Sequence, residues 1–148
     1  MPPAANFLYQ DVNYDGVKDL VLLETAPQFP QPIQLTVLPG DGTGKFGSPL
    51  RSPLLSSGNE PRVFDYALAN VRGTGIPDLV LLGTEDNPGS GPLLVYAKNN
   101  GDGTFQAPAI TPFSTICPIQ FVAGDFNNDG KLDLMTLSLT PCSGGSYS

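Results

Sequence analysis

Short apolar runs, separated by polar segments rich in glycine and proline, recur along the chain. Residues 33–38 alternate apolar and polar side chains, which is typical of a half-buried β-strand. Residues 19–24 and 79–82 contain continuous apolar runs of the length expected for buried strands. No segment has a convincing 3.6-residue helical period. The sequence therefore predicts an all-β fold.

The predicted strands follow one order twice and begin it a third time. Each unit contains a strand, a polar loop, a buried strand, a further strand and a turn with the sequence Gly-Asp-Gly. The polar loops start at residues 11, 70 and 125. Repeats of four short antiparallel strands at this spacing predict β-propeller blades, which stack because one blade cannot cover its own apolar faces. The predicted strands are residues 5–10, 19–24, 33–38, 62–69, 79–82, 93–97, 119–124 and 134–139.

The repeats divide one continuous domain of 148 residues into about two and a half blades. We assign residues 5–57 to the first repeat, 60–114 to the second and 117–142 to half of a third. The expected fold is a partial or open propeller, and three interpretations remain: a fragment of a longer propeller, a protomer completed by other subunits, and an extended open array. The strand edges and the blade face that an unclosed array leaves uncovered favour self-association.

Two of the polar loops carry the same order of oxygen-bearing side chains. Ca²⁺ is bound by about six to eight oxygen atoms, which tight loops supply from alternate positions. An EF-hand is excluded, because its twelfth position requires Glu and these loops have Leu22 and Thr136 there. A plain polar turn is the alternative, since Asp, Asn and Gly are common turn residues. The candidate side-chain ligands are Asp11, Asn13, Asp15 and Asp19 in the first loop, and Asp125, Asn127, Asp129 and Asp133 in the third.

The middle loop departs from this pattern. Asn70, Arg72, Thr74 and Asp78 occupy the positions of the four candidate ligands. The guanidinium of Arg72 carries a permanent positive charge, because arginine does not deprotonate in proteins. We expect Arg72 to pair with Asp78 and to leave this loop without a metal.

Charge and composition exclude several classes of function. The net charge is −7, and the first and third loops hold six of the fourteen acidic residues, so the negative charge is concentrated where cations would bind. No basic patch is present for a nucleic acid, and no apolar stretch is long enough to span a membrane. The first residues also lack the basic and apolar regions of a signal peptide.

An enzymatic function is not expected. The chain contains no histidine, which excludes Ser–His and Cys–His nucleophile pairs. Asp41 and Asp102 lie in the Gly-Asp-Gly turns, where a role in the turn is the simpler interpretation, and Asp65 has no evident partner. Cys117 and Cys142 flank one predicted hairpin. They are either buried free thiols or, in an oxidising compartment, a disulfide.

The D-x-N-x-D-G-x-x-D-L loops, together with Gly-Asp-Gly turns that lead to a phenylalanine and a proline, resemble the FG-GAP/VCBS repeat family. This family is known from the propellers of integrin α chains and from bacterial secreted proteins. The resemblance implies that each loop joins the first two strands of a blade and binds Ca²⁺. It thus implies two calcium sites formed by the eight candidate ligands and by the backbone carbonyls of Val17 and Lys131.

The resulting hypothesis is a non-catalytic, calcium-stabilised module for adhesion or self-assembly, located outside the cell or at its surface. Its expected partners are further copies or repeats, or a protein or glycan ligand. Two alternatives remain: a lectin-like, carbohydrate-binding propeller and a scaffold fragment of a larger secreted enzyme. The absence of tryptophan gives the first alternative little support, because exposed aromatic platforms are the usual sign of a sugar site.

Overall fold

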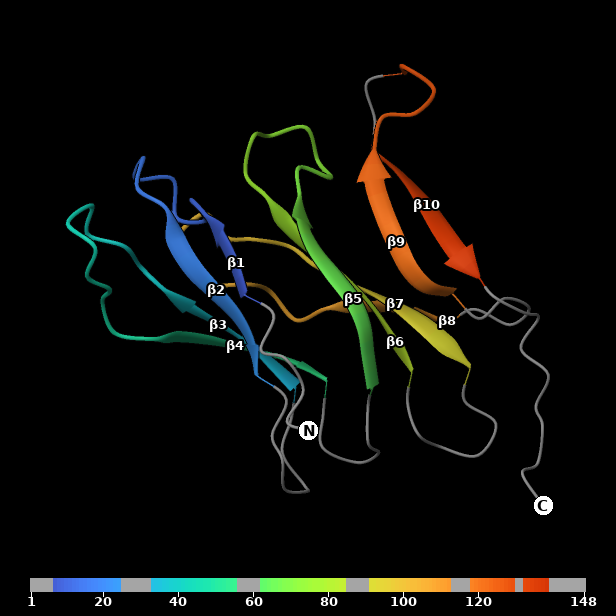
Figure 1. Cartoon of the computed structure of the whole chain (residues 1–148), viewed down its shortest axis with the longest axis horizontal. Coiled ribbons are helices and arrows are strands. Elements are labelled where there is room, and N and C mark those ends of the chain that lie inside the picture. Colours follow the sequence, from blue (N-terminus) through green and yellow to red (C-terminus); the bar gives the residue numbers. More distant parts are fainter. Residues whose placement is uncertain are drawn as a thin grey trace.

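The computed structural model describes residues 7–24, 33–55, 62–84, 91–112, 118–129 and 132–138, and these ranges contain strands and turns but no helix. The prediction of an all-β fold is confirmed (Figure 1). Accordingly, no described residue belongs to a helix that could cross a membrane. The strands are β1 (Phe7–Gln10), β2 (Asp19–Glu24), β3 (Ile33–Leu38), β4 (Leu50–Leu55), β5 (Arg62–Ala69), β6 (Asp78–Thr84), β7 (Pro92–Ala97), β8 (Ala109–Pro112), β9 (Pro118–Gly124) and β10 (Asp133–Ser138).

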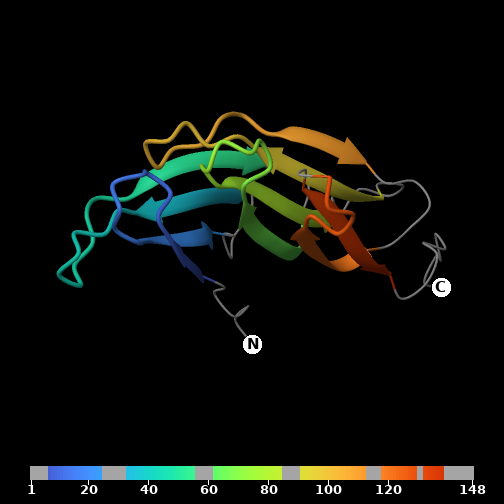
Figure 2. The same cartoon turned by 90° about the horizontal axis from the view of Figure 1, so that it is seen from above.

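The strands form three antiparallel sheets in which each strand pairs with the next one along the chain. The first sheet has the order β1-β2-β3-β4, the second β5-β6-β7-β8, and the third contains β9 and β10. The sheets follow one another through the molecule, with the first and third at its two ends (Figure 2). This is the partial arrangement of blades expected from the repeat.

Alternation along β6 shows why the sheets stack. Leu79 and Leu81 are fully buried against the first sheet, in a cluster that includes Val21. Val80 and Leu82 point to the opposite face, where they are buried with Phe121 of the third sheet. Each buried side chain of this size contributes about 1.5–3 kcal/mol. β6 is therefore covered on both faces, which explains its continuously apolar sequence.

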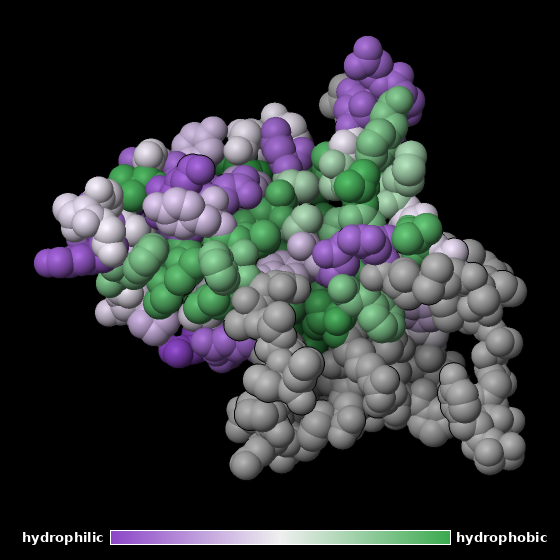
Figure 3. All heavy atoms as spheres, in the orientation of Figure 1, coloured by the Kyte–Doolittle hydropathy of each residue, from purple (hydrophilic) through white to green (hydrophobic). Residues whose placement is uncertain are grey.

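The three loops that join the first two strands of each sheet lie at one end of the molecule (Figure 1). The tip of the β9–β10 loop is strongly hydrophilic, whereas hydrophobic side chains gather over the sheets (Figure 3). The stacking thus places all three polar loops on the same side.

Two sequence predictions concern residues outside the described part of the chain. These are the pairing of Cys117 with Cys142 and the backbone ligand at Lys131.

Candidate cation-binding loops

The first loop is folded by hydrogen bonds from its own backbone to its polar side chains. Asp11 accepts from Tyr14 N–H at 2.7 Å and from Gly16 N–H at 3.0 Å. Asn13 Oδ1 accepts from Asp15 N–H at 3.1 Å. Tyr14 adopts a left-handed conformation with φ of 69°, and Gly16 has φ of 84°, where a Cβ would be unfavourable. The sequence order of Asp, Asn and Gly thus determines a tight, inward-folded loop.

Asp19, at the ninth position of this loop, is fully buried at the start of β2. Its Oδ2 accepts from Val12 N–H at 2.9 Å, and its Oδ1 accepts from Gly40 N–H at 2.9 Å. Asp19 therefore ties the loop to the turn that follows β3. A charged group buried in this way requires such partners.

The third loop repeats this arrangement. Asp129 N–H donates to Asp125 Oδ1 at 3.1 Å and to Asn127 Oδ1 at 2.9 Å. Phe126 N–H donates to Asp133 Oδ2 at 3.1 Å, as Val12 N–H does to Asp19. Asn128 has φ of 66°, as Tyr14 does at the same position. The two loops thus place the same donor residues in the same local fold.

The middle loop contains the ion pair that the sequence predicts. Arg72 Nη2 lies 2.8 Å from Asp78 Oδ1, and Arg72 Nε donates to Asp78 Oδ2 at 2.9 Å. Asp78 is fully buried, like Asp19, and also accepts from Asn99 N–H and from the Tyr96 hydroxyl, each at 2.9 Å. A permanent cation is therefore held by the carboxylate at the ninth position. That the middle loop binds no metal stays a prediction.

The electrostatics of this pair follow from its surroundings. Burial favours the neutral form of Asp78, but hydrogen bonds from Arg72, Asn99 and Tyr96 and the charge of Arg72 outweigh it and lower the pKa of this carboxyl. In turn, the hydrogen bond to Asp78 raises the pKa of the Arg72 guanidinium. The pKa of Tyr96 is raised by burial and by the neighbouring Asp78. The middle loop is thus an ionised and hydrogen-bonded unit.

The first and third loops have the donor chemistry that suits a hard cation. Among the described residues, no three Asp, Glu, Cys or His side chains already converge on one point. The carboxylates instead accept backbone N–H groups. An ionised carboxylate has about four acceptor positions, so these hydrogen bonds leave it able to bind a cation as well. By donor type the two loops fit Ca²⁺.

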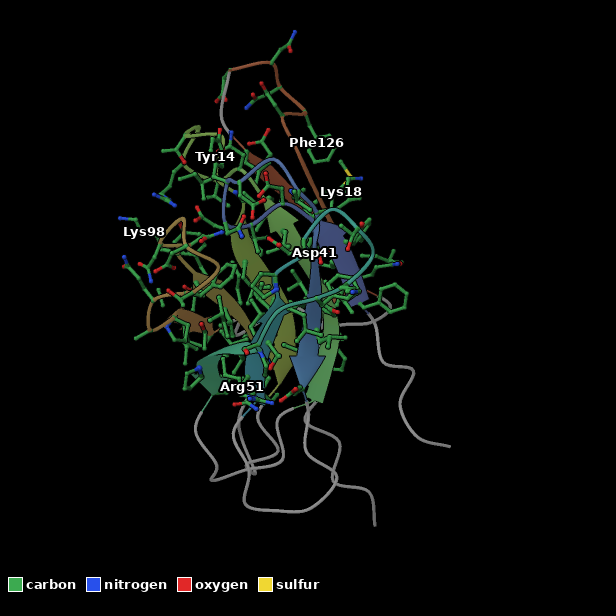
Figure 4. The ribbon with its side chains drawn as sticks, turned by 90° about the vertical axis from the view of Figure 1, so that its left-hand side faces the viewer. Tyr14, Lys18, Asp41, Arg51, Lys98 and Phe126 are labelled. Atoms are coloured by element: carbon green, nitrogen blue, oxygen red, sulfur yellow. The ribbon has the colours of Figure 1, made fainter. Side chains whose placement is uncertain are left out.

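The Gly-Asp-Gly turns have a structural role in the geometry. Asp41 accepts from the backbone and hydroxyl of Thr43, and Asp102 accepts likewise from Thr104. These hydrogen bonds lower the pKa of both exposed aspartates. The side-chain view places Asp41 below the end that carries Tyr14, Lys18 and Phe126 (Figure 4).

Sequence reasoning missed the polar side chains that join the sheets. Asn99 is buried and donates to Val12 O and to Pro77 O, each at 2.9 Å. Ser52 Oγ accepts from Phe105 N–H at 2.9 Å, and Asp65 Oδ2 accepts from Phe121 N–H at 3.2 Å. Their partners are distant in the sequence, and no motif marks them.

The loops also touch one another. A Cβ atom at Gly75 would lie 2.6 Å from the hydroxyl oxygen of Tyr14, so the middle loop contacts the first. Tyr14 is otherwise 62% exposed. The first two loops therefore form one continuous surface.

Comparison with known proteins agrees with this geometry. Residues 70–136 match a family model described as an FG-GAP-like repeat. The matched segment begins at Asn70, the first residue of the middle loop, and extends into β10. No match was found among the curated proteins or the solved structures. Over residues 70–136 the chain is therefore similar to the FG-GAP-like repeat family.

Proposed function

We propose that this protein is a non-catalytic repeat module, stabilised by calcium in its first and third loops, that acts in adhesion or self-assembly outside the cell or at its surface. The observation that carries the proposal is the Arg72–Asp78 pair. In the middle loop a buried ninth-position carboxylate holds a guanidinium. Asp19 and Asp133 stand at the same position in loops that have no arginine.

Charge supports the same interpretation. The first loop carries three carboxylates within nine residues, and so does the third. Like charges at such spacing destabilise one another unless a cation lies among them. In the middle loop Arg72 and Asp78 instead neutralise each other. Calcium in the two acidic loops would make the three loops electrostatically equivalent.

Calcium would act as a structural ligand. It would be held by the oxygen atoms of the two acidic loops and would fix the connection between the first two strands of each sheet. Loops of extracellular modules bind Ca²⁺ with dissociation constants on the order of 10⁻⁴–10⁻³ M, which suits calcium-rich surroundings. This is the argument for a location outside the cell.

The test is a calorimetric titration with CaCl₂, combined with thermal unfolding in calcium and in excess chelator. We expect two bound ions and a melting temperature that falls when calcium is removed, because a ligand that binds only the folded form stabilises it by mass action. Asp15→Asn should lose one of the two ions. The matched control Asp102→Asn, in a turn outside the loops, should keep both. An unchanged melting temperature in chelator would contradict calcium stabilisation, and a third bound ion would contradict the role given to Arg72.

A further inference from the structure

Strand register gives the equivalent positions of the three sheets. Asp19, Asp78 and Asp133 begin the second strand of each sheet and pair with Gln10, Ala69 and Gly124 of the first strand. Three residues earlier, the first strands carry Phe7, Tyr66 and Phe121. An aromatic residue thus occupies the same place in every first strand.

These three aromatic residues differ in exposure in a regular way. Tyr66 is 8% exposed and packs against the first sheet, and Phe121 is 7% exposed and packs against the second. Phe7 is 63% exposed. Tyr66 and Phe121 therefore each point towards the preceding sheet, whereas Phe7 stands on the face where the first sheet has no described neighbour.

Two more positions of the first sheet follow the same rule. Tyr9 is 57% exposed, whereas its equivalent Leu68 packs in the core between the first two sheets. Phe46 is 43% exposed, whereas its equivalent Phe105 is 7% exposed. We call Phe7, Tyr9 and Phe46 the N-side face. Their equivalents in the second sheet, Tyr66, Leu68 and Phe105, pack against the first sheet.

The third sheet presents the opposite half of this interface. Val80 and Leu82 of β6 are buried towards the following sheet, and their equivalents Met135 and Leu137 are 59% and 53% exposed. Phe126 takes the place of the fully buried Val12 and is 50% exposed. Val122, on the same face of β9, is 56% exposed. We call Val122, Phe126, Met135 and Leu137 the C-side face.

Two strands are enough to form this type of interface. The third sheet contacts the second mainly through β9, which packs against β5 and β6. In a contact between the two ends, β1 would take the place of β9, and β9 with β10 would take the place of β5 with β6. The polar link also has a counterpart, because the exposed Gln120 stands at the position of Asp65, which accepts the N–H group of Phe121.

We propose that the N-side face of one copy binds the C-side face of a second copy of this chain, head to tail. The first sheet, which carries the N-side face, and the third sheet, which carries the C-side face, lie at the two ends of the molecule, so one copy cannot satisfy both (Figure 2). The contact would continue the sheet-to-sheet interface that already occurs twice within the chain. A heterologous contact of this kind forms a ring or an open filament. This inference rests on the self-assembly part of the proposed function and names its partner and surfaces.

The test uses sedimentation velocity of the full chain over a concentration series, with three lysine variants. Phe7→Lys blocks the N-side face, Met135→Lys blocks the C-side face, and Ile110→Lys is the matched control at a similarly exposed position of β8. We expect the wild-type chain and the control to assemble as concentration rises. Either end variant should stay monomeric, with association weakened roughly a hundredfold or more, because an unpaired ammonium would be buried in an apolar contact.

Mixing the two end variants gives the decisive result. Phe7→Lys keeps its C-side face and Met135→Lys keeps its N-side face, so the mixture should form a one-to-one dimer and nothing larger. A monomeric wild-type chain, assembly of either end variant alone, or a mixture without dimer would overturn the proposal. Circular dichroism of each variant verifies the fold. A wild-type chain that binds two calcium ions but remains monomeric would leave the calcium-stabilised module intact and would overturn only this inference.

Discussion

Gly40 occupies a place where the backbone of two loops comes into contact. Its N–H group donates to the buried Asp19, and a Cβ atom at this position would lie 2.2 Å from the carbonyl oxygen of Lys18. No side-chain rotation relieves a clash between two backbones. Glycine is therefore required at Gly40 by space rather than by its conformational freedom.

The lack of room for a side chain at Gly40 leads to a prediction about stability. Gly40→Ala should lower the free energy of unfolding by about 1–3 kcal/mol, because the turn after β3 must move away from the first loop. Gly47→Ala is the matched control, since a Cβ there would lie 3.6 Å from the nearest atom, which is ordinary contact. Urea unfolding of the two variants measures the difference. Equal stability would show that the turn moves without cost.

Residue-level partners could be predicted only where they are close in the sequence. Arg72 and Asp78 are six residues apart within one loop, and their pairing follows from charge alone. Asn99 and Val12 are 87 residues apart, and Asp65 and Phe121 are 56 apart. Asparagine in a turn is ordinary, so the sequence contains no signal that Asn99 binds another sheet.

At the level of elements, the second strand of each sheet was predictable because it begins with an aspartate and continues as a largely apolar run. Predicted β3 and β5 coincide with the observed bounds, whereas β4 (Leu50–Leu55) and β8 (Ala109–Pro112) were expected only from the four-stranded pattern. These two outer strands each contain a proline, which is tolerated at a sheet edge but weakens the strand signal. The local fold of the first and third polar loops was also predictable, because the side chains that accept their backbone hydrogen bonds lie within the same loop.

The middle loop, as an element, should respond to acid. The pKa of Asp78 is lowered in the folded state, so its ionised form stabilises the fold above the ordinary value of 3.8. That contribution should disappear as the pH falls through the lower folded-state pKa, because the protonated carboxyl no longer holds the charge of Arg72.

The measurement compares the free energy of unfolding of the wild type and Asp78→Asn across this range of pH. The difference between them should be constant near neutral pH and should shrink below pH 3.8. The comparison isolates Asp78 from Asp41 and Asp102, whose lowered pKa values affect both proteins equally. A difference that does not change with pH would contradict an ionised Asp78 in the fold.

At the scale of the whole molecule, the stacking of sheets is the feature that the sequence could not specify in detail. Apolar runs show that β6 is buried on both faces, but the pattern does not say which neighbour covers which face. That choice is made by contacts such as Tyr66 against the first sheet and Phe121 against the second. Once the register is known, the same positions explain why the outermost faces remain apolar and exposed.

Substitution of Asn99 can test how the first two sheets are held together. Its side-chain N–H group reaches Val12 O in the first loop and Pro77 O in the middle loop, and its Oδ1 accepts from Gly101 N–H. Asn99→Ala should lower the free energy of unfolding by about 1–3 kcal/mol, because two buried carbonyls lose their donor. Asn100→Ala, at the neighbouring exposed position, is the control.

Amide hydrogen exchange should also accelerate in the first loop of the Asn99 variant. If exchange there stayed at the wild-type rate while stability fell, Asn99 would support only its own turn and would not link the first two sheets.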